Sequence, residues 1–273
     1  MTPRSPAKAG AQERASAAVA APWTPASAGE QPDPRTEYLL RLGDDALVLG
    51  QRLSEWCGHG PILEVDISLA NLALDLIGQA TLLLGEAGDG DSLAFHRDVL
   101  DFRNCLLVEQ PNGDFAQTIA RHLLYTTWQH MLLDRLQQSS DRFLVEFAHK
   151  AVKEVAYHRE LAGEWTVRLG DGTEESARRM AEGLDWMWRF IPELFEVDDG
   201  LQAAIDAGIA PNPRAFEEDY RSAIAQVLDE ARLEPPADQR PILGGRRGHH
   251  SEHLGHLLAV MQFLPRTYPD AKW

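Results

Sequence analysis

Apolar side chains recur at intervals of three and four residues from Glu37 onward, the spacing typical of helices that bury one face. Breaks that contain glycine or proline divide this pattern into segments. The long segments predict helices over Tyr38–Cys57, Asp66–Leu84, residues 114–136 with Asp114 as N-cap, and Asp141–Leu169. The sequence has none of the alternating Val/Ile/Thr-rich runs that are typical of strands, so it predicts an all-α fold built as a helical bundle.

Shorter helices are expected around these four. The predicted positions are Leu93–Leu107 (one or two short helices), Thr173–Phe195, Leu201–Ala207, Pro213–Leu233 and Ser251–Leu264, with a loop over Glu234–His250. Residues 1–36 differ from the rest, because they are rich in Ala, Pro and Ser and show no hydrophobic periodicity. We expect a disordered tail over 1–36 and one folded domain over 37–273.

Charge and composition narrow the classes of function. Acidic residues number 42 and basic residues 26, and the net charge of −16 argues against a nucleic-acid surface or binding to anionic lipid. We find no apolar run that approaches the roughly 18 residues needed to span a bilayer, and therefore expect no membrane partner. The two cysteines, Cys57 and Cys105, are expected to be free thiols in a reducing cytoplasm.

The helix predicted over Asp66–Leu84 is apolar nearly all round, which predicts that it is buried inside the bundle. Its polar exceptions form one stripe, because they lie three to four residues apart: Ser68, Asn71, Asp75 and Gln79. Two interpretations are open. The stripe is either a structural ladder of hydrogen bonds or part of a metal or substrate site inside the bundle.

The candidate metal ligands are Glu55, Asp75, Glu154 and His158. A di-iron bundle needs a carboxylate from each of two helices and a Glu-x-x-His pair from each of the other two. Gly78 and Tyr157 stand where the histidines of those pairs would be needed. We therefore expect no working dinuclear centre, and we assign no metal ligand and no catalytic residue, while a weak or single-metal site stays open. The four candidates are interpreted as a vestigial polar core, in which loss of one buried partner would cost about 3–5 kcal/mol.

Two motifs near the C-terminus are further candidates. The Gly244–Gly248 loop could hold phosphates through its backbone N–H groups and arginines. His253 and His256 are three residues apart and could chelate a metal, although a polar helix start explains them as well.

Several separated segments resemble, in order, the C subunit of phenylacetyl-CoA 1,2-epoxidases. They are residues 38–44, 55–59, 74–80, 108–113, 153–154 with 157–158, 188–190, 244–258, 261–262 and Trp273. The resemblance covers the chain from about residue 37. It implies a ferritin-like bundle with additional C-terminal helices. It also implies a non-catalytic, structural subunit that pairs with a di-iron catalytic A subunit in aerobic phenylacetate degradation.

The resemblance further implies a B subunit and a reductase that contains FAD and iron–sulfur, with no cofactor in this chain. The complex would epoxidise the aromatic ring of phenylacetyl-CoA, which binds at a shared site. The positions that match minor substrate contacts are Asp101, Phe102, Arg103 and Asn104, together with Gln202, Ala203 and Ala204.

Three functions therefore remain open. The first is a scaffold that stabilises the catalytic subunit and helps shape the CoA entrance. The second is a ferritin-like oxygenase subunit with its own redox metal centre. The third is a homo-oligomeric ferritin-like protein with another task.

Overall fold

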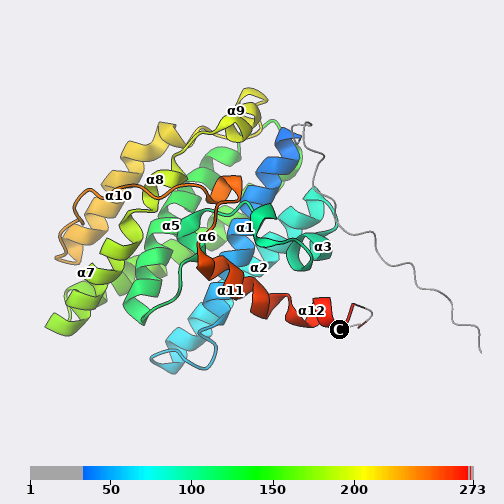
Figure 1. Cartoon of the computed structure of the whole chain (residues 1–273). Helices are drawn as coiled ribbons and strands as arrows, with labels where there is room; N and C mark the ends of the chain where they lie inside the picture. The colour runs from blue at the N-terminus through cyan, green and yellow to red at the C-terminus, as the bar shows by residue number, and fades with distance from the viewer. Residues whose placement is uncertain (1–32, 270, 272–273) are drawn as a thin grey trace, which may run out of the picture.

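The computed structural model describes residues 33–269 and 271, which form a bundle of helices without any strand among them (Figure 1). Its four long helices are α1 (Pro34–Ser54), α2 (Leu63–Ala87), α5 (Phe115–Leu136) and α6 (Arg142–Gly170). Helix α1 packs along α2, α5 packs along α6, and α2 also contacts α6. The predicted all-α, ferritin-like bundle is confirmed.

Side-chain caps set the starts of these helices. Asp114 accepts a hydrogen bond from the Gln117 N–H at 2.9 Å, as predicted, and Asp141 caps α6 in the same way. Helix α1 begins at Pro34, earlier than predicted, because Asp33 caps it and proline is favoured in the first turn. Residues 34–36 are thus helical, whereas the predicted disorder of residues 1–32 falls outside the described residues.

Shorter elements complete the chain. They are α3 (Gly90–Phe95), η1 (Val99–Asp101), α4 (Leu106–Glu109), α7 (Glu174–Trp188), α8 (Ile191–Leu194), α9 (Asp199–Asp206), η2 (Pro213–Phe216), α10 (Glu217–Glu230), η3 (Gly245–Arg247), α11 (Glu252–Met261) and α12 (Phe263–Thr267). The helix predicted over Thr173–Phe195 is divided into α7 and α8, because Pro192 has no N–H with which to continue the helical ladder.

Helix α2 differs from its prediction as a fully buried helix. Its Leu69, Leu72 and Leu76 are fully buried, but Leu63 and Leu74 are about 70% exposed. By length and composition α2 could also cross a membrane, which was not expected, yet 44% of that apolar window is buried within the protein. A helix that is apolar all round has no periodic signal that could indicate which side its neighbours cover.

The segment that follows α10 positions the candidate site. It runs back across the molecule to η3 and α11 (Figure 1). Helix α11 contacts both α1 and η1. This return places Gly244–His250 beside the short loop of residues 102–105, which is more than 100 positions earlier in the sequence.

Candidate functional site

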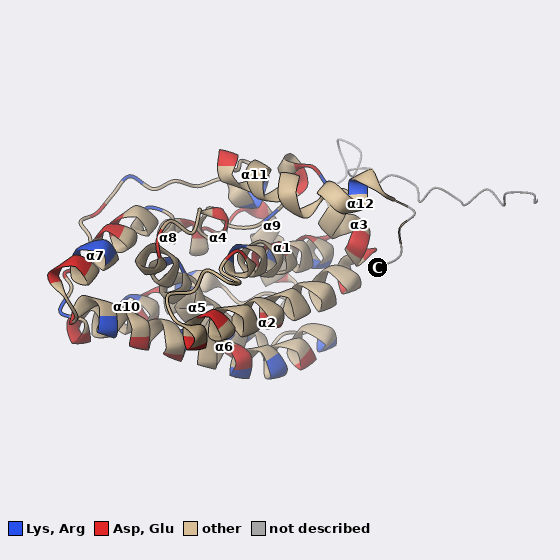
Figure 2. Cartoon of the chain, turned by 90° about the horizontal axis from the view of Figure 1, so that it is seen from below, with Lys and Arg blue, Asp and Glu red and all other residues tan. Residues whose placement is uncertain are grey.

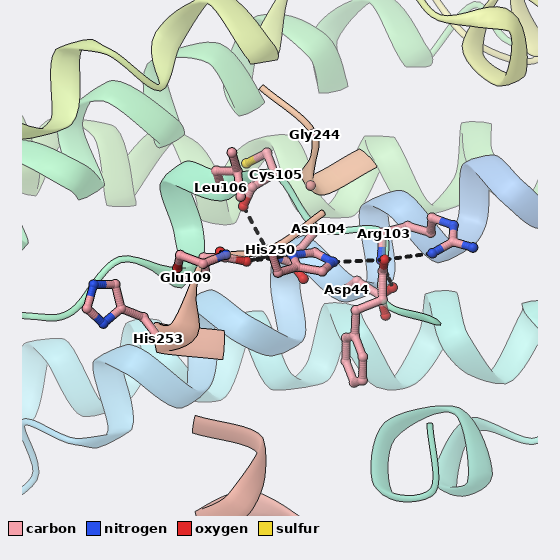
Figure 3. Close-up of polar contacts among 12 residues, drawn as sticks. Asp44, Arg103, Asn104, Cys105, Leu106, Glu109, Gly244, His250 and His253 are labelled. Carbon is pink, nitrogen blue, oxygen red and sulfur yellow. Dashed lines mark hydrogen bonds and ion pairs between the residues drawn. The ribbon is translucent and has the colours of Figure 1, made fainter. Parts of the chain in front are cut away.

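Two adjacent carboxylates of α1 hold the loop of residues 102–105. Asp44 accepts a hydrogen bond from the Arg103 N–H at 2.8 Å, and Asp45 accepts one from the Cys105 N–H, also at 2.8 Å. Both carboxylates are fully buried. Because they bind backbone groups on alternate residues, they fix the loop against α1. Figure 3 shows Asp44 beside Arg103.

Two buried arginines balance these carboxylates. Arg97 forms an ion pair with Asp44, and neither side chain is exposed. Arg246 reaches Asp45 at 2.7 Å and donates to the Arg103 carbonyl at 3.0 Å. Burial alone would lower the pKa of Arg246, but Asp45, Cys105 and Glu193 together outweigh burial and raise it. The loop is therefore enclosed by charges that compensate one another.

Glu109, at the end of α4, joins the other side of the same loop to α11. Its carboxylate accepts from Asn104 Nδ2 at 2.9 Å and from the Ser251 N–H at 2.6 Å, and it lies 2.7 Å from His250 Nδ1. The other ring nitrogen of His250 lies 3.0 Å from the Phe102 carbonyl oxygen. Figure 3 shows Glu109 and His250 pointing toward each other. We call Glu109, His250 and Asn104 the Glu109 clasp.

A fourth carboxylate changes the interpretation of the Gly244–Gly248 loop. Glu193 accepts from the Leu106, Gly244 and Gly245 N–H groups at 2.6–2.8 Å, and burial raises its pKa. A Cβ atom on Gly245 would lie 2.4 Å from the Asn104 carbonyl oxygen, so this contact needs glycine. The glycine N–H groups suggested for phosphate binding therefore already have a partner within the protein.

The loop opens on one side into a pocket of about 540 Å³. Arg103 and Ala203 line this pocket, so two of the expected substrate-contact segments come together there. Phe102, Asn104 and Ala204 are fully buried away from it. The two remaining positions make local contacts: Asp101 accepts from the Asp98 N–H at 3.2 Å, and exposed Gln202 donates to Asp206 at 2.7 Å.

The pocket contains further arginines that the sequence analysis did not single out for this site. Arg41 pairs with Glu37 at 3.1 Å and with Asp198 at 2.9 Å, while Arg247 pairs with Glu196 at 2.6 Å. Their charges are partly neutralised, so an anionic ligand would have to compete with these carboxylates. Their positions at a single pocket depend on the return of the C-terminal segment, for which the local sequence gives no signal.

A second polar cluster lies between α2, α5 and α6, which we call the polar row. His158 Nε2 lies 3.2 Å from Asp75, Gln79 donates to Glu154 at 3.0 Å, and Gln129 donates to Gln79 at 3.2 Å. Three of the four predicted core residues are thus neighbours. Glu55 lies apart at the end of α1, where it binds Arg52 and Asn112.

The polar row is more exposed than predicted. The Asp75 side chain is 41% exposed and that of Glu154 is 23% exposed. The predicted cost of 3–5 kcal/mol for losing one partner assumed a fully buried pair, and solvent access reduces it to about 1 kcal/mol. His158 itself is fully buried, and burial lowers the pKa of this histidine more than Asp75 raises it.

His122 of α5 also belongs to this region, and the sequence analysis missed it. Its ring lies 5.5 Å from that of His158, it is fully buried, and neither ring nitrogen has a hydrogen-bond partner among the described residues. Burial lowers its pKa well below the usual value. The spacing of His122, Thr126 and Gln129 along one helix face was the available signal. Within the part of the chain that the structure describes, no group of three or more His, Cys, Asp or Glu residues could hold a metal ion.

The family model described as "Phenylacetic acid catabolic protein" matches residues 13–273. The chain belongs to this family. It is 46% identical over 244 residues to the C subunit of the 1,2-phenylacetyl-CoA epoxidase of Escherichia coli (strain K12), and the match covers 87% of this chain and 98% of that protein. The match to the family model begins at residue 13, whereas the resemblance was expected to begin at about residue 37.

For a member of the phenylacetic acid catabolic protein family, the two clusters differ in what they can do. In the polar row, two amides and a histidine form hydrogen bonds with one another or with the two carboxylates. These residues do not fit a di-iron group, which needs more carboxylates and two Glu-x-x-His pairs. The pocket beside the 102–105 loop is open and lined by both arginines and acids, so a phosphate-bearing ligand would bind its arginines in competition with Glu37 and Asp198.

Proposed function

We propose that this chain is a non-catalytic, structural subunit of a phenylacetyl-CoA 1,2-epoxidase complex in phenylacetate catabolism. The observation that carries the proposal is the polar row. At the centre of a ferritin-like bundle, where an active subunit would place carboxylates and Glu-x-x-His pairs, this chain places the hydrogen-bonded amides of Gln79 and Gln129. The match over nearly the full length of an epoxidase C subunit supports the same role.

In this proposal a catalytic partner subunit supplies the di-iron centre. A B subunit and a reductase with FAD and iron–sulfur complete the cytoplasmic complex. This chain stabilises the catalytic subunit and adds minor contacts to phenylacetyl-CoA, whose phosphates would meet Arg103 at the edge of the pocket. The Asp44 and Asp45 anchors and the Glu109 clasp hold the loop that presents Arg103.

Two measurements on the purified chain test the proposal. The first is elemental analysis for iron and manganese after expression alone in metal-supplemented medium. Metal well below one atom per chain is expected. One or two tightly bound atoms would favour the alternative of an oxygenase subunit with its own centre, and Asp75, Glu154 and His158 would then be the first residues to mutate.

The second measurement is co-purification with the catalytic subunit of the same organism. A stable complex is expected, together with loss of epoxidase activity when this chain is omitted. If the two chains do not associate, the partner role is wrong, and a homo-oligomeric protein with another task becomes the better interpretation.

A further inference from the structure

One face of α2 carries large apolar side chains that nothing in the described structure covers. Leu63, Ile67 and Leu74 are 70%, 51% and 69% exposed. They are four and seven residues apart, so they line up along one side of the helix. Leu82, 46% exposed, lies at the edge of the same side. We call these four residues the α2 stripe.

Small residues continue the line of the α2 stripe toward the end of the helix. Gly78 and Gly85 lie on the same side, and a Cβ atom added to either would meet nothing within 4 Å. The face is therefore open and flat, so another helix could approach its backbone closely. Exposed apolar surface of this kind on a helix typically marks an interaction site.

A groove beside the α2 stripe adds depth to this surface. It lies between α2 and α6 and has a volume of about 310 Å³. Its apolar lining includes Leu74, Leu82, Phe143 and Phe147, and Gln79 and Glu154 of the polar row lie at its side. A bulky apolar side chain from a partner could enter it, as interface anchors do.

Charge distinguishes between possible occupants. Helix α2 has neither Lys nor Arg, and its acidic residues are Glu64, Asp66, Asp75 and Glu86, of which Glu86 pairs with Arg35 at 2.6 Å. The α6 wall of the groove adds one base, Lys150, which lies 3.5 Å from Glu154. In Figure 2 its ribbon shows red without blue. A second copy of this chain would place these acids against its own acids, and an anionic membrane would be repelled as well. A helix with an apolar face and flanking Lys or Arg would match both the stripe and its charge.

The size of the surface indicates how far the contact extends. From Leu63 to Gly85 this face of α2 is about 33 Å long, and a helix about 10 Å wide would cover about 330 Å² of it. A stable interface buries about 800 Å² on each partner. The outer side of α6, where Tyr157 is 49% exposed one turn after Glu154, is the adjacent surface that could supply the rest.

We infer that the α2 stripe and the α2–α6 groove dock a helix of the catalytic subunit whose contact face is apolar and flanked by basic residues. This inference rests on the proposed function and specifies its interface. The partner's basic residues face the acids of α2, and one of its bulky apolar side chains fills the groove.

The test is to titrate the purified full chain with the catalytic subunit and to measure the Kd by isothermal titration calorimetry. Leu74→Lys is expected to raise the Kd at least about 30-fold, as loss of an interface hot spot does. Leu74→Glu is expected to raise it less, because the new carboxylate faces basic residues. The matched control is Val260→Lys on α11, at a side chain that is 82% exposed, and it should leave the Kd unchanged. Circular dichroism and Tm verify that each variant folds.

The outcomes separate this inference from the proposed function. Wild-type binding that Leu74→Lys leaves intact would overturn the docking surface but not the structural role, whereas failure of the wild type to bind would overturn the role itself. A greater loss of affinity with Leu74→Glu than with Leu74→Lys would show that the partner's contact face is not flanked by basic residues. If the wild type self-associates in sedimentation and Leu74→Lys abolishes this, the occupant is a second copy of the chain and the inference is wrong. If the wild type floats with phosphatidylcholine vesicles and Leu74→Lys abolishes this, the occupant is a membrane and the inference is again wrong.

Discussion

Replacement of Glu109 by Gln tests how strongly the Glu109 clasp holds the loop of residues 102–105. The carboxylate is fully buried and meets two donors, Asn104 Nδ2 and the Ser251 N–H, together with the His250 ring. Glutamine keeps one acceptor oxygen, which can still bind the Ser251 N–H. Its NH₂ group would then face the Asn104 amide and the His250 ring, so donors would meet donors.

The expected loss of stability follows from these contacts. Two hydrogen bonds to a charged acceptor are lost, each worth about 1.5–3 kcal/mol. Together these two lost bonds predict a fall of about 3–6 kcal/mol in the free energy of unfolding. At roughly 2–4 °C per kcal/mol, the Tm should fall by about 6–24 °C.

Urea unfolding monitored by circular dichroism and tryptophan fluorescence measures this change. The matched control is Glu64→Gln, because the Glu64 carboxylate is exposed on α2 and its loss should change stability by less than about 0.5 kcal/mol. A loss below about 1 kcal/mol for Glu109→Gln, at an unchanged m-value, would refute the idea that the clasp holds the loop.

Three further predictions concern the pocket and the polar row. Arg103→Ala in the assembled complex should raise the KM for phenylacetyl-CoA several-fold with little change in kcat, and an unchanged KM would remove Arg103 from the substrate site. Glu154→Ala should lower the free energy of unfolding by about 1 kcal/mol, because the variant loses little beyond the Gln79 contact at a partly exposed position. A loss of stability above about 3 kcal/mol in urea unfolding would contradict this prediction. Because burial lowers the pKa of His122 well below 6.5, the unfolded chain binds a proton that the folded chain excludes, and stability should fall as the pH drops below 6.5. The slope contributed by His122 is at most about 1.4 kcal/mol per pH unit, and pH-dependent unfolding of His122→Leu should lack it.

Sequence patterns predicted the structure best where local signals decide it. Asp114 and Asp141 begin α5 and α6 because a capping carboxylate acts within its own first turn. Sequence patterns were less successful for α2, where apolar residues surround the whole helix and only its neighbours decide which side is covered. Glu55 shows the same limit: it was grouped with Asp75 by residue type, but its position at the end of α1 directs it to Arg52.

The candidate site was only partly predictable for a related reason. The resemblance named Arg103 and Ala203, and the structure brings them to one pocket with Arg41 and Arg247. The Glu109 clasp had no signal in the sequence, because Glu109 and His250 are 141 residues apart and their pairing depends on the long return after α10.

Residue types at short spacing were enough to specify the helical fold, the ends of α5 and α6 and the lack of a di-iron ligand pattern. The packing of the folded chain was needed to establish which side of α2 stays open, which carboxylates bind the 102–105 loop, and how far the polar row is exposed to solvent. The physical reason is that burial and ion pairing depend on which distant segments become neighbours, and neither hydrophobic periodicity nor capping specifies those contacts.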